Sequence, residues 1–183
     1  MERDYGILEL TGKEKGKLMF LYLGICAMVS WLFYHSFWAV LPFLIGFPVF
    51  LKKQKERKIR ERREELLTEF LTGIHAVASA LDAGYSMENA LGEALKETEK
   101  VYGADGVFTE ELREMERKRN LNQSLESLWA DLGKRSGMED IENFGEIFQV
   151  ARRSGGNLKE IIRSTADNIS RKTETRREIE ISL

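Results

Sequence analysis

A long apolar segment without a formal charge constrains this chain more than any other feature. It extends over residues 18–51, between Lys17 and Lys52. In water this segment would be a large unprotected apolar surface, whereas the hydrocarbon core of a bilayer is a matching solvent. As a single helix it would span about 50 Å, well beyond a hydrocarbon core of about 30 Å. The polar pair His35-Ser36 divides the segment, so the sequence predicts a transmembrane helical hairpin over residues 18–51.

Basic residues flank the apolar segment on both sides. Three lysines lie within residues 1–17, which we expect to form a cytoplasmic lead-in. A basic juxtamembrane collar over residues 52–65 follows the segment and begins with Lys52, Lys53, Lys55, Arg57 and Lys58. By the positive-inside rule, both ends of the hairpin and the domain after it face the cytoplasm. The sequence therefore predicts a multi-pass protein of the cytoplasmic (inner) membrane.

The apolar segment has two alternative interpretations. A signal peptide is disfavoured because the segment is too long and no small-residue cleavage site follows it. A shallow re-entrant loop is the main alternative, because each half is short and the second half contains Pro42 and Pro48.

The charge of the chain is unevenly distributed. The formal net charge is −2, yet the collar is rich in Lys and Arg while residues 66–183 hold an excess of Asp and Glu. A basic collar followed by an acidic body favours contact with anionic lipid over nucleic-acid binding. The single cysteine, Cys26, lies in the apolar segment, and His35 and His75 have no metal-ligand spacing. We therefore expect no metal, no cofactor and no nucleic-acid partner.

Residues 66–183 have the composition of a helical domain. No proline follows Pro48, and Leu, Ala, Glu, Lys and Arg dominate. Apolar residues recur at steps of three and four, which is typical of helices with one buried face. The predicted fold class is thus all-α: an N-terminal transmembrane helical hairpin, then a cytoplasmic antiparallel bundle of about six helices.

Three expectations about individual helices can be tested by a structure. The first bundle helix should grow directly out of the collar. A short, very polar helix should begin at Thr109 and end near Arg119, as the least core-like segment of the domain, either mobile or partner-facing. A later helix should place one apolar stripe at the centre of the core, formed by Met138, Ile141, Phe144, Ile147, Phe148 and Ala151.

Two turns have strong local signals. Gly84 suits the left-handed position after a helix, and Ser86 suits the N-cap of the next helix. Further on, Gly155 and Gly156 should stop one helix, while Asn157 and Glu160 form a capping-box pattern for the last. That last helix becomes strongly polar and basic after Ile169, as a helix returning to the membrane surface would.

These motifs, in this order and spacing, resemble a known family. The hairpin with basic flanks, the stretch Ala83-Gly-Tyr-Ser-Met-Glu-Asn-Ala-Leu91 and the stretch Arg153-Ser-Gly-Gly-Asn-Leu158 are similar to the type II secretion system F family. Within that family the likeness is to the inner-membrane platform proteins of Tad (Flp) pili. The resemblance implies a six-helix cytoplasmic bundle in a non-enzymatic platform that couples a secretion ATPase to pilin insertion.

The resemblance also implies partners and raises one difference. The expected partners are the bilayer, a secretion ATPase, a sister platform subunit and pilin, within a homo- or hetero-oligomer. Proteins of this family usually have a second membrane hairpin after the cytoplasmic domain, which this sequence lacks. We therefore expect the chain to be a fragment or the product of a split or truncated gene.

No pattern in the sequence indicates catalysis. Gly155-Gly156 lacks the phosphate-loop frame, and Ser86 is not in a nucleophile elbow. We therefore expect no catalytic residues. Acidic residues outnumber basic ones between Glu88 and Glu116, and this region is the predicted partner-docking face. Its candidate residues are Glu88, Glu93, Glu97, Glu110, Glu111 and Glu114.

The alternative function is a membrane-anchored helical signalling or receptor domain. Such a domain would need a heptad dimer seam running through the collar into the first bundle helix. Residues 52–65 are almost wholly charged apart from Ile59, which counts against that seam.

Overall fold

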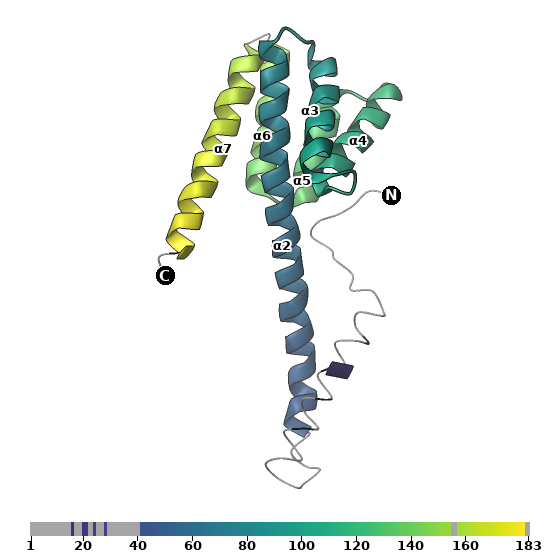
Figure 1. Ribbon diagram of the computed structural model, residues 1–183, viewed down its shortest axis with the longest axis vertical. Helices are drawn as coiled ribbons and strands as arrows, with labels where there is room; N and C mark the ends of the chain where they lie inside the picture. Colours follow the sequence, from purple (N-terminus) through teal and green to yellow (C-terminus); the bar gives the residue numbers. More distant parts are fainter. Residues whose placement is uncertain are drawn as a thin grey trace. The chain divides into compact units, whose positions relative to one another are not determined.

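The computed structural model describes residues 41–154 and 157–181, together with residues 16, 20, 21, 24 and 28. Over this part of the chain it shows six α-helices and no strand, so the all-α prediction is confirmed (Figure 1). The helices are α2 (Leu41–Asp82), α3 (Met87–Tyr102), α4 (Val107–Asn120), α5 (Leu125–Ser136), α6 (Glu139–Ser154) and α7 (Leu158–Ile181). The chain divides into two compact units, with the boundary between Glu61 and Arg62.

The predicted hairpin falls largely outside the described residues. Residues 29–40, which include the predicted tip His35-Ser36, are not among them, nor are most of residues 1–28. Among the residues that the structure does describe, no helix combines the length and the apolar content needed to cross a bilayer. The predicted continuous helix from the collar into the bundle is confirmed, because α2 is unbroken from Leu41 to Asp82.

Aromatic rings from four helices form the centre of the bundle. Phe70 of α2 contacts Phe108 of α4 and Phe144 of α6, each with ring centroids 5.3 Å apart in edge-to-face geometry. Trp129 of α5 contacts Phe144 at 5.0 Å, and Phe148 packs beside it. Edge-to-face pairs add about 0.5–1.5 kcal/mol each beyond the burial of the rings. The core is therefore held by contacts between helices distant in sequence.

The helix α4 differs from its prediction in both start and role. It begins at Val107 rather than at Thr109, and its Phe108, Leu112 and Met115 are buried in the core. The expectation that this helix is the least core-like segment of the domain is therefore wrong.

The physical reason lies on α2, far from α4 in sequence. Glu69 is buried, and its Oε2 accepts a hydrogen bond of 2.8 Å from the backbone N–H of Phe108. The residue before the helix, Gly106, makes no side-chain cap of its own. A carboxylate at the positive end of a helix satisfies an otherwise unpaired donor. Glu69 thus caps α4 from outside and draws its first turn into the core.

One residue of the predicted α6 stripe faces solvent. Ile141, Phe144, Phe148 and Ala151 are buried as predicted, but Ile147 is 40% exposed. The α5–α6 pair is very close: a Cβ added to Gly133 of α5 would lie 2.8 Å from the Cα of Glu142. Because α6 turns this close face toward α5, the edge of its apolar stripe at Ile147 is left uncovered.

The helix α7 is attached to the bundle by both apolar and ionic contacts. Ile162, Ala166 and Ile169 are buried. Asp82 at the end of α2 pairs with Lys159 (2.6 Å) and with Arg163 (3.1 Å). Further along, Lys172 pairs with Asp140 of α6 at 2.6 Å.

Candidate functional site

The turn between α2 and α3 has the local geometry that its residues favour. Gly84 adopts φ +89°, a left-handed conformation that side chains disfavour. Ser86 is the N-cap of α3, and its hydroxyl accepts a hydrogen bond from the Asn89 N–H at 3.3 Å. The turn reverses the chain so that α3 returns alongside α2.

The start of α7 is capped in the same way. Asn157 Oδ1 accepts from the Glu160 N–H at 3.4 Å, and Asn157 Nδ2 donates to the Glu160 carboxylate at 3.1 Å. Gly155 and Gly156 lie outside the described residues. The caps in both turns explain their residues without any ligand.

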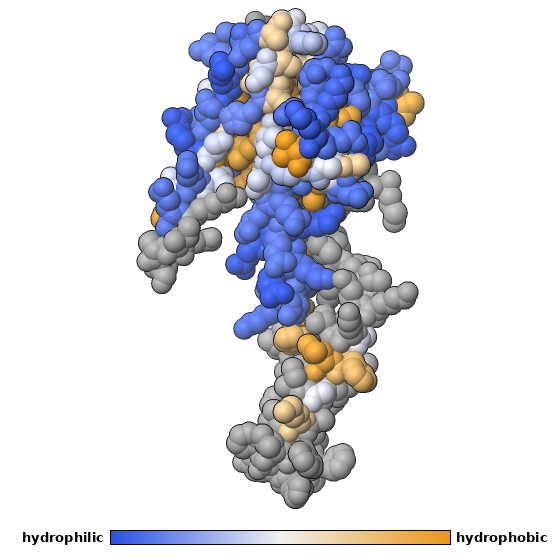
Figure 2. All heavy atoms as spheres, in the orientation of Figure 1, coloured by the Kyte–Doolittle hydropathy of each residue, from blue (hydrophilic) through white to orange (hydrophobic). Residues whose placement is uncertain are grey.

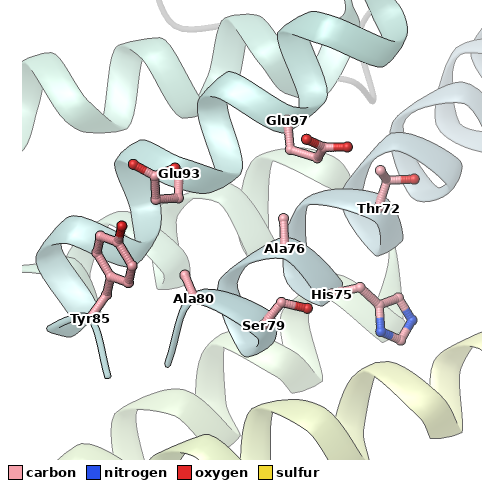
Figure 3. Close-up of a pocket in the computed structure, with 8 residues that line it drawn as sticks. All are labelled: Thr72, His75, Ala76, Ser79, Ala80, Tyr85, Glu93 and Glu97. Atoms are coloured by element: carbon pink, nitrogen blue, oxygen red, sulfur yellow. The ribbon is translucent and has the colours of Figure 1, made fainter. Parts of the chain in front are cut away.

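An open pocket of about 630 Å³ lies between α2 and α3, and we call it the groove. Figure 3 shows that its floor comes from α2 and that α3 supplies two acidic side chains along one side. The lining residues are Thr72, His75, Ala76, Ser79, Ala80, Tyr85, Glu93 and Glu97.

Two polar residues at one end of the groove, Thr72 and His75, contact neighbouring helices (Figure 3). The Thr72 hydroxyl lies 2.9 Å from the Tyr102 hydroxyl at the end of α3. His75 points toward α7, where its Nε2 lies 3.3 Å from Ser170 Oγ (Figure 3). The first pair links the two helices that form the groove, and the second links its floor to α7.

The floor of the groove consists mainly of small side chains. Ala76 is half-buried, Ala80 is buried, and Ser79 and Tyr85 are exposed. Figure 2 shows a pale strip along the upper part of α2, between strongly hydrophilic surfaces. Apart from His75, the floor is therefore a helix face of small side chains.

The predicted docking residues on α3 differ in their surroundings. Glu93 and Glu97 line the groove, and we call this pair the acidic rim. Their ionic contacts are to lysines of the same helix: Lys96 at 2.7 Å from Glu93, and Lys100 at 4.0 Å from Glu97. The hydrogen bond to Glu93 raises the pKa of Lys96 above its ordinary value.

Glu88 lies outside the groove, at the start of α3. Its carboxylate pairs with Arg152 of α6 at 3.1 Å. A hydrogen bond from its own backbone N–H lowers the pKa of Glu88, and Arg152 lowers it further. Arg152 also pairs with Glu126 of α5 at 2.9 Å, so this corner connects three helices.

The predicted docking residues on α4 differ in how deeply they are buried. Glu110 and Glu114 are half-buried. A hydrogen bond from Arg117, at 2.6 Å, lowers the pKa of Glu114. Glu111 is only 5% exposed, so it cannot belong to an accessible docking face and its prediction is corrected here.

Glu111 belongs instead to a buried ionic cluster. Arg135 of α5 donates two hydrogen bonds to its carboxylate, at 3.1 and 2.7 Å, and one to Asp131 at 2.8 Å. These bonds raise the pKa of Arg135 above its ordinary value despite partial burial. The bidentate geometry ties α4 to α5 and explains why an acidic residue occupies an inward position.

The collar residues Lys52, Lys53 and Arg57 are exposed, while Lys55 and Lys58 are half-buried. Arg57 pairs with Glu61 one turn later at 3.3 Å. Within the described residues, no group of three His, Cys, Asp or Glu side chains could hold a metal ion.

Sequence reasoning missed the groove and two buried carboxylate contacts. The small residues of α2 indicated a close helix neighbour, but not that part of the face stays open. The contacts of Glu69 and Glu111 depend on helices that lie 39 and 24 residues away in sequence. No local pattern identifies such partners.

The fold and the groove define an all-α helical-bundle domain with an open helix face. Comparison with protein-family profiles matches residues 74–183 to the family described as Type II secretion system (T2SS), protein F. That match covers more than half of the chain, so the chain belongs to this family. No curated protein and no solved structure matched the chain.

Proposed function

We propose that this chain is a non-enzymatic platform component of the inner membrane, in a secretion or type IV pilus system of the Tad (Flp) kind. It couples a cytoplasmic secretion ATPase to export of pilin or another substrate, alongside a sister platform subunit. The observation that supports the proposal most directly is the family match, which extends over the bundle from α2 to the end of the chain.

The charge distribution supports a docking role for the bundle. The docking face comprises Glu88, Glu93, Glu97, Glu110 and Glu114, now without Glu111. Within it, the acidic rim pairs with exposed lysines of its own helix in the part of the chain that the structure describes. Exposed pairs of this kind contribute about 0–1 kcal/mol, so a partner's cations can replace the lysines at little cost.

Binding of the ATPase tests the proposal. The full chain in membrane vesicles should co-sediment with the secretion ATPase encoded nearest to it. Reversing the acidic rim, with Glu93→Lys and Glu97→Lys, should weaken the affinity about tenfold or more, because like charges would face each other. The matched control reverses Glu142 and Glu146, an exposed acidic pair with the same spacing on α6. If the folded wild-type chain does not bind, the motor-coupling function is excluded.

The proposed membrane topology has its own test. The hairpin over residues 18–51 places His35-Ser36 on the far side of the membrane from the bundle. In a chain carrying Cys26→Ala, the substitution Ser36→Cys should react with a membrane-impermeant thiol reagent added outside. Ser79→Cys in the groove should react only after the membrane is opened. Labelling of both positions from the same side would exclude the hairpin.

A further inference from the structure

The length of the groove matches a short stretch of α-helix. Its floor extends from Thr72 to Ala80 on α2. At about 1.5 Å per residue this length is about 12 Å, or slightly more than two helical turns. The groove is therefore long enough for about two turns of a docked helix.

The floor favours close approach of another helix. Ala76, Ser79 and Ala80 lie at steps of three and four residues, so they form one face of α2. Small side chains let two helix backbones come nearer than the usual 8–10 Å. Tyr85 is 48% exposed at one end of the groove, where an aromatic ring can cover the end of a docked helix.

The acidic rim determines the charge of the occupant. Glu93 and Glu97 are four residues apart and line the same side of the groove (Figure 3). The side chains of their partners Lys96 and Lys100 are 72% and 78% exposed. Neither lysine lines the groove, so the carboxylates can accept hydrogen bonds from a helix that occupies it.

We propose that the groove receives one α-helix of the secretion ATPase, with small residues along its contact seam and lysine or arginine on the flank that faces Glu93 and Glu97. This inference rests on the proposed function, because the ATPase supplies the helix. The small floor residues allow close contact only with a helix that has small residues along its seam. The acidic rim then orients the basic flank of that helix toward Glu93 and Glu97.

Filling the groove without changing its charge is the sharpest test. Ser79→Leu adds a long side chain to an exposed position of the floor, which the fold should tolerate. In the full chain in vesicles, it should weaken ATPase binding by about tenfold or more, as expected for a contact at the centre of an interface. The matched control Asn143→Leu adds the same side chain to an exposed position of α6 and should leave the affinity unchanged.

A second pair of variants tests the charge. Neutralising Glu93 and Glu97 to Gln should weaken binding and reduce its dependence on salt. The control is Glu99→Gln, also on α3, because Glu99 pairs with Arg113 of α4 at 3.0 Å and does not line the groove. An equal loss in the control would contradict the role of the acidic rim.

Cross-linking identifies the occupant. A photoreactive amino acid at position 79 of the full chain should cross-link to a lysine- or arginine-rich helix of the ATPase, and the same group at position 143 should not. Cross-links from position 79 to a second copy of this chain would overturn the proposal.

The experiments distinguish a failure of the proposed function from a failure of the groove proposal. If the wild-type chain does not bind the ATPase, the proposed function fails and takes the inference with it. If it binds, and Ser79→Leu binds equally well, the inference alone is overturned.

Discussion

The buried ionic cluster and the acidic rim use the same side chains for opposite purposes. In the cluster, Glu111 is almost fully covered and receives two hydrogen bonds from Arg135 of another helix. At the rim, Glu93 and Glu97 contact lysines of their own helix, and these lysines are largely exposed. A covered carboxylate that joins two helices is needed for the fold, whereas an exposed one paired within its own helix is available to a partner. Burial and the origin of the cation therefore separate structural acids from candidate docking acids.

The largest loss of stability should follow from a substitution in the buried ionic cluster. Glu111→Gln leaves the guanidinium of Arg135 in a covered position without its main counter-charge. Removing one partner of a buried pair costs about 3–5 kcal/mol. The free energy of unfolding, measured by urea denaturation of the detergent-solubilised chain, should fall by that amount. A loss no larger than that of Glu93→Gln would contradict the distinction drawn here.

Glu69 provides an intermediate case, because it is buried but its partner is a backbone N–H. Glu69→Ala should lower the free energy of unfolding by about 1–2 kcal/mol, as expected for the loss of a helix cap. The control is Glu65→Ala, at an exposed position one turn earlier on α2. If both variants unfold alike, the cap does not stabilise the first turn of α4.

The stability that Glu88 contributes should depend on pH, which tests its place between the structural and the docking acids. Its pKa is lowered from the ordinary value of 4.5, so the unfolded chain binds its proton more readily than the folded chain. The stability from Glu88 is therefore present above about pH 4.5 and is lost as the pH falls through the folded-state pKa. Because Glu88 is half-exposed, we expect less than about 1 kcal/mol. The difference in unfolding free energy between wild type and Glu88→Gln should shrink on acidification; a constant difference would contradict the assignment.

The smallest effect on stability should come from the acidic rim. Glu93→Gln together with Glu97→Gln should change the free energy of unfolding by no more than about 0.5 kcal/mol, the range of ordinary surface substitutions. The same variant should nevertheless weaken ATPase binding. A large loss of stability would show that Glu93 and Glu97 are needed for the fold, and would contradict their assignment as docking residues.

Local chemistry allowed much of the fold to be predicted from the sequence. The Gly84 and Ser86 turn and the Asn157 cap of α7 involve neighbours within a few residues, so capping rules identify them. The stripe of α6 was predicted one residue too wide at Ile147, because periodicity indicates the direction of a buried face but not the width that other helices cover.

The candidate site was harder to predict. Glu93, Glu97 and Glu111 look alike in the sequence, and only the tertiary position of Arg135 separates the third from the others. The groove could not be predicted either, because it depends on where α3 stops covering α2. Residue type alone does not determine such a boundary.

The cap that Glu69 places on α4 has a mechanical consequence. Consecutive residues on a helix differ by about 100° in direction, so even a one-residue shift or a modest axial rotation of α2 would carry this carboxylate away from the Phe108 N–H. Such a movement would leave a buried N–H donor without its partner, which costs free energy. The contact thus couples rotation of α2 to the start of α4.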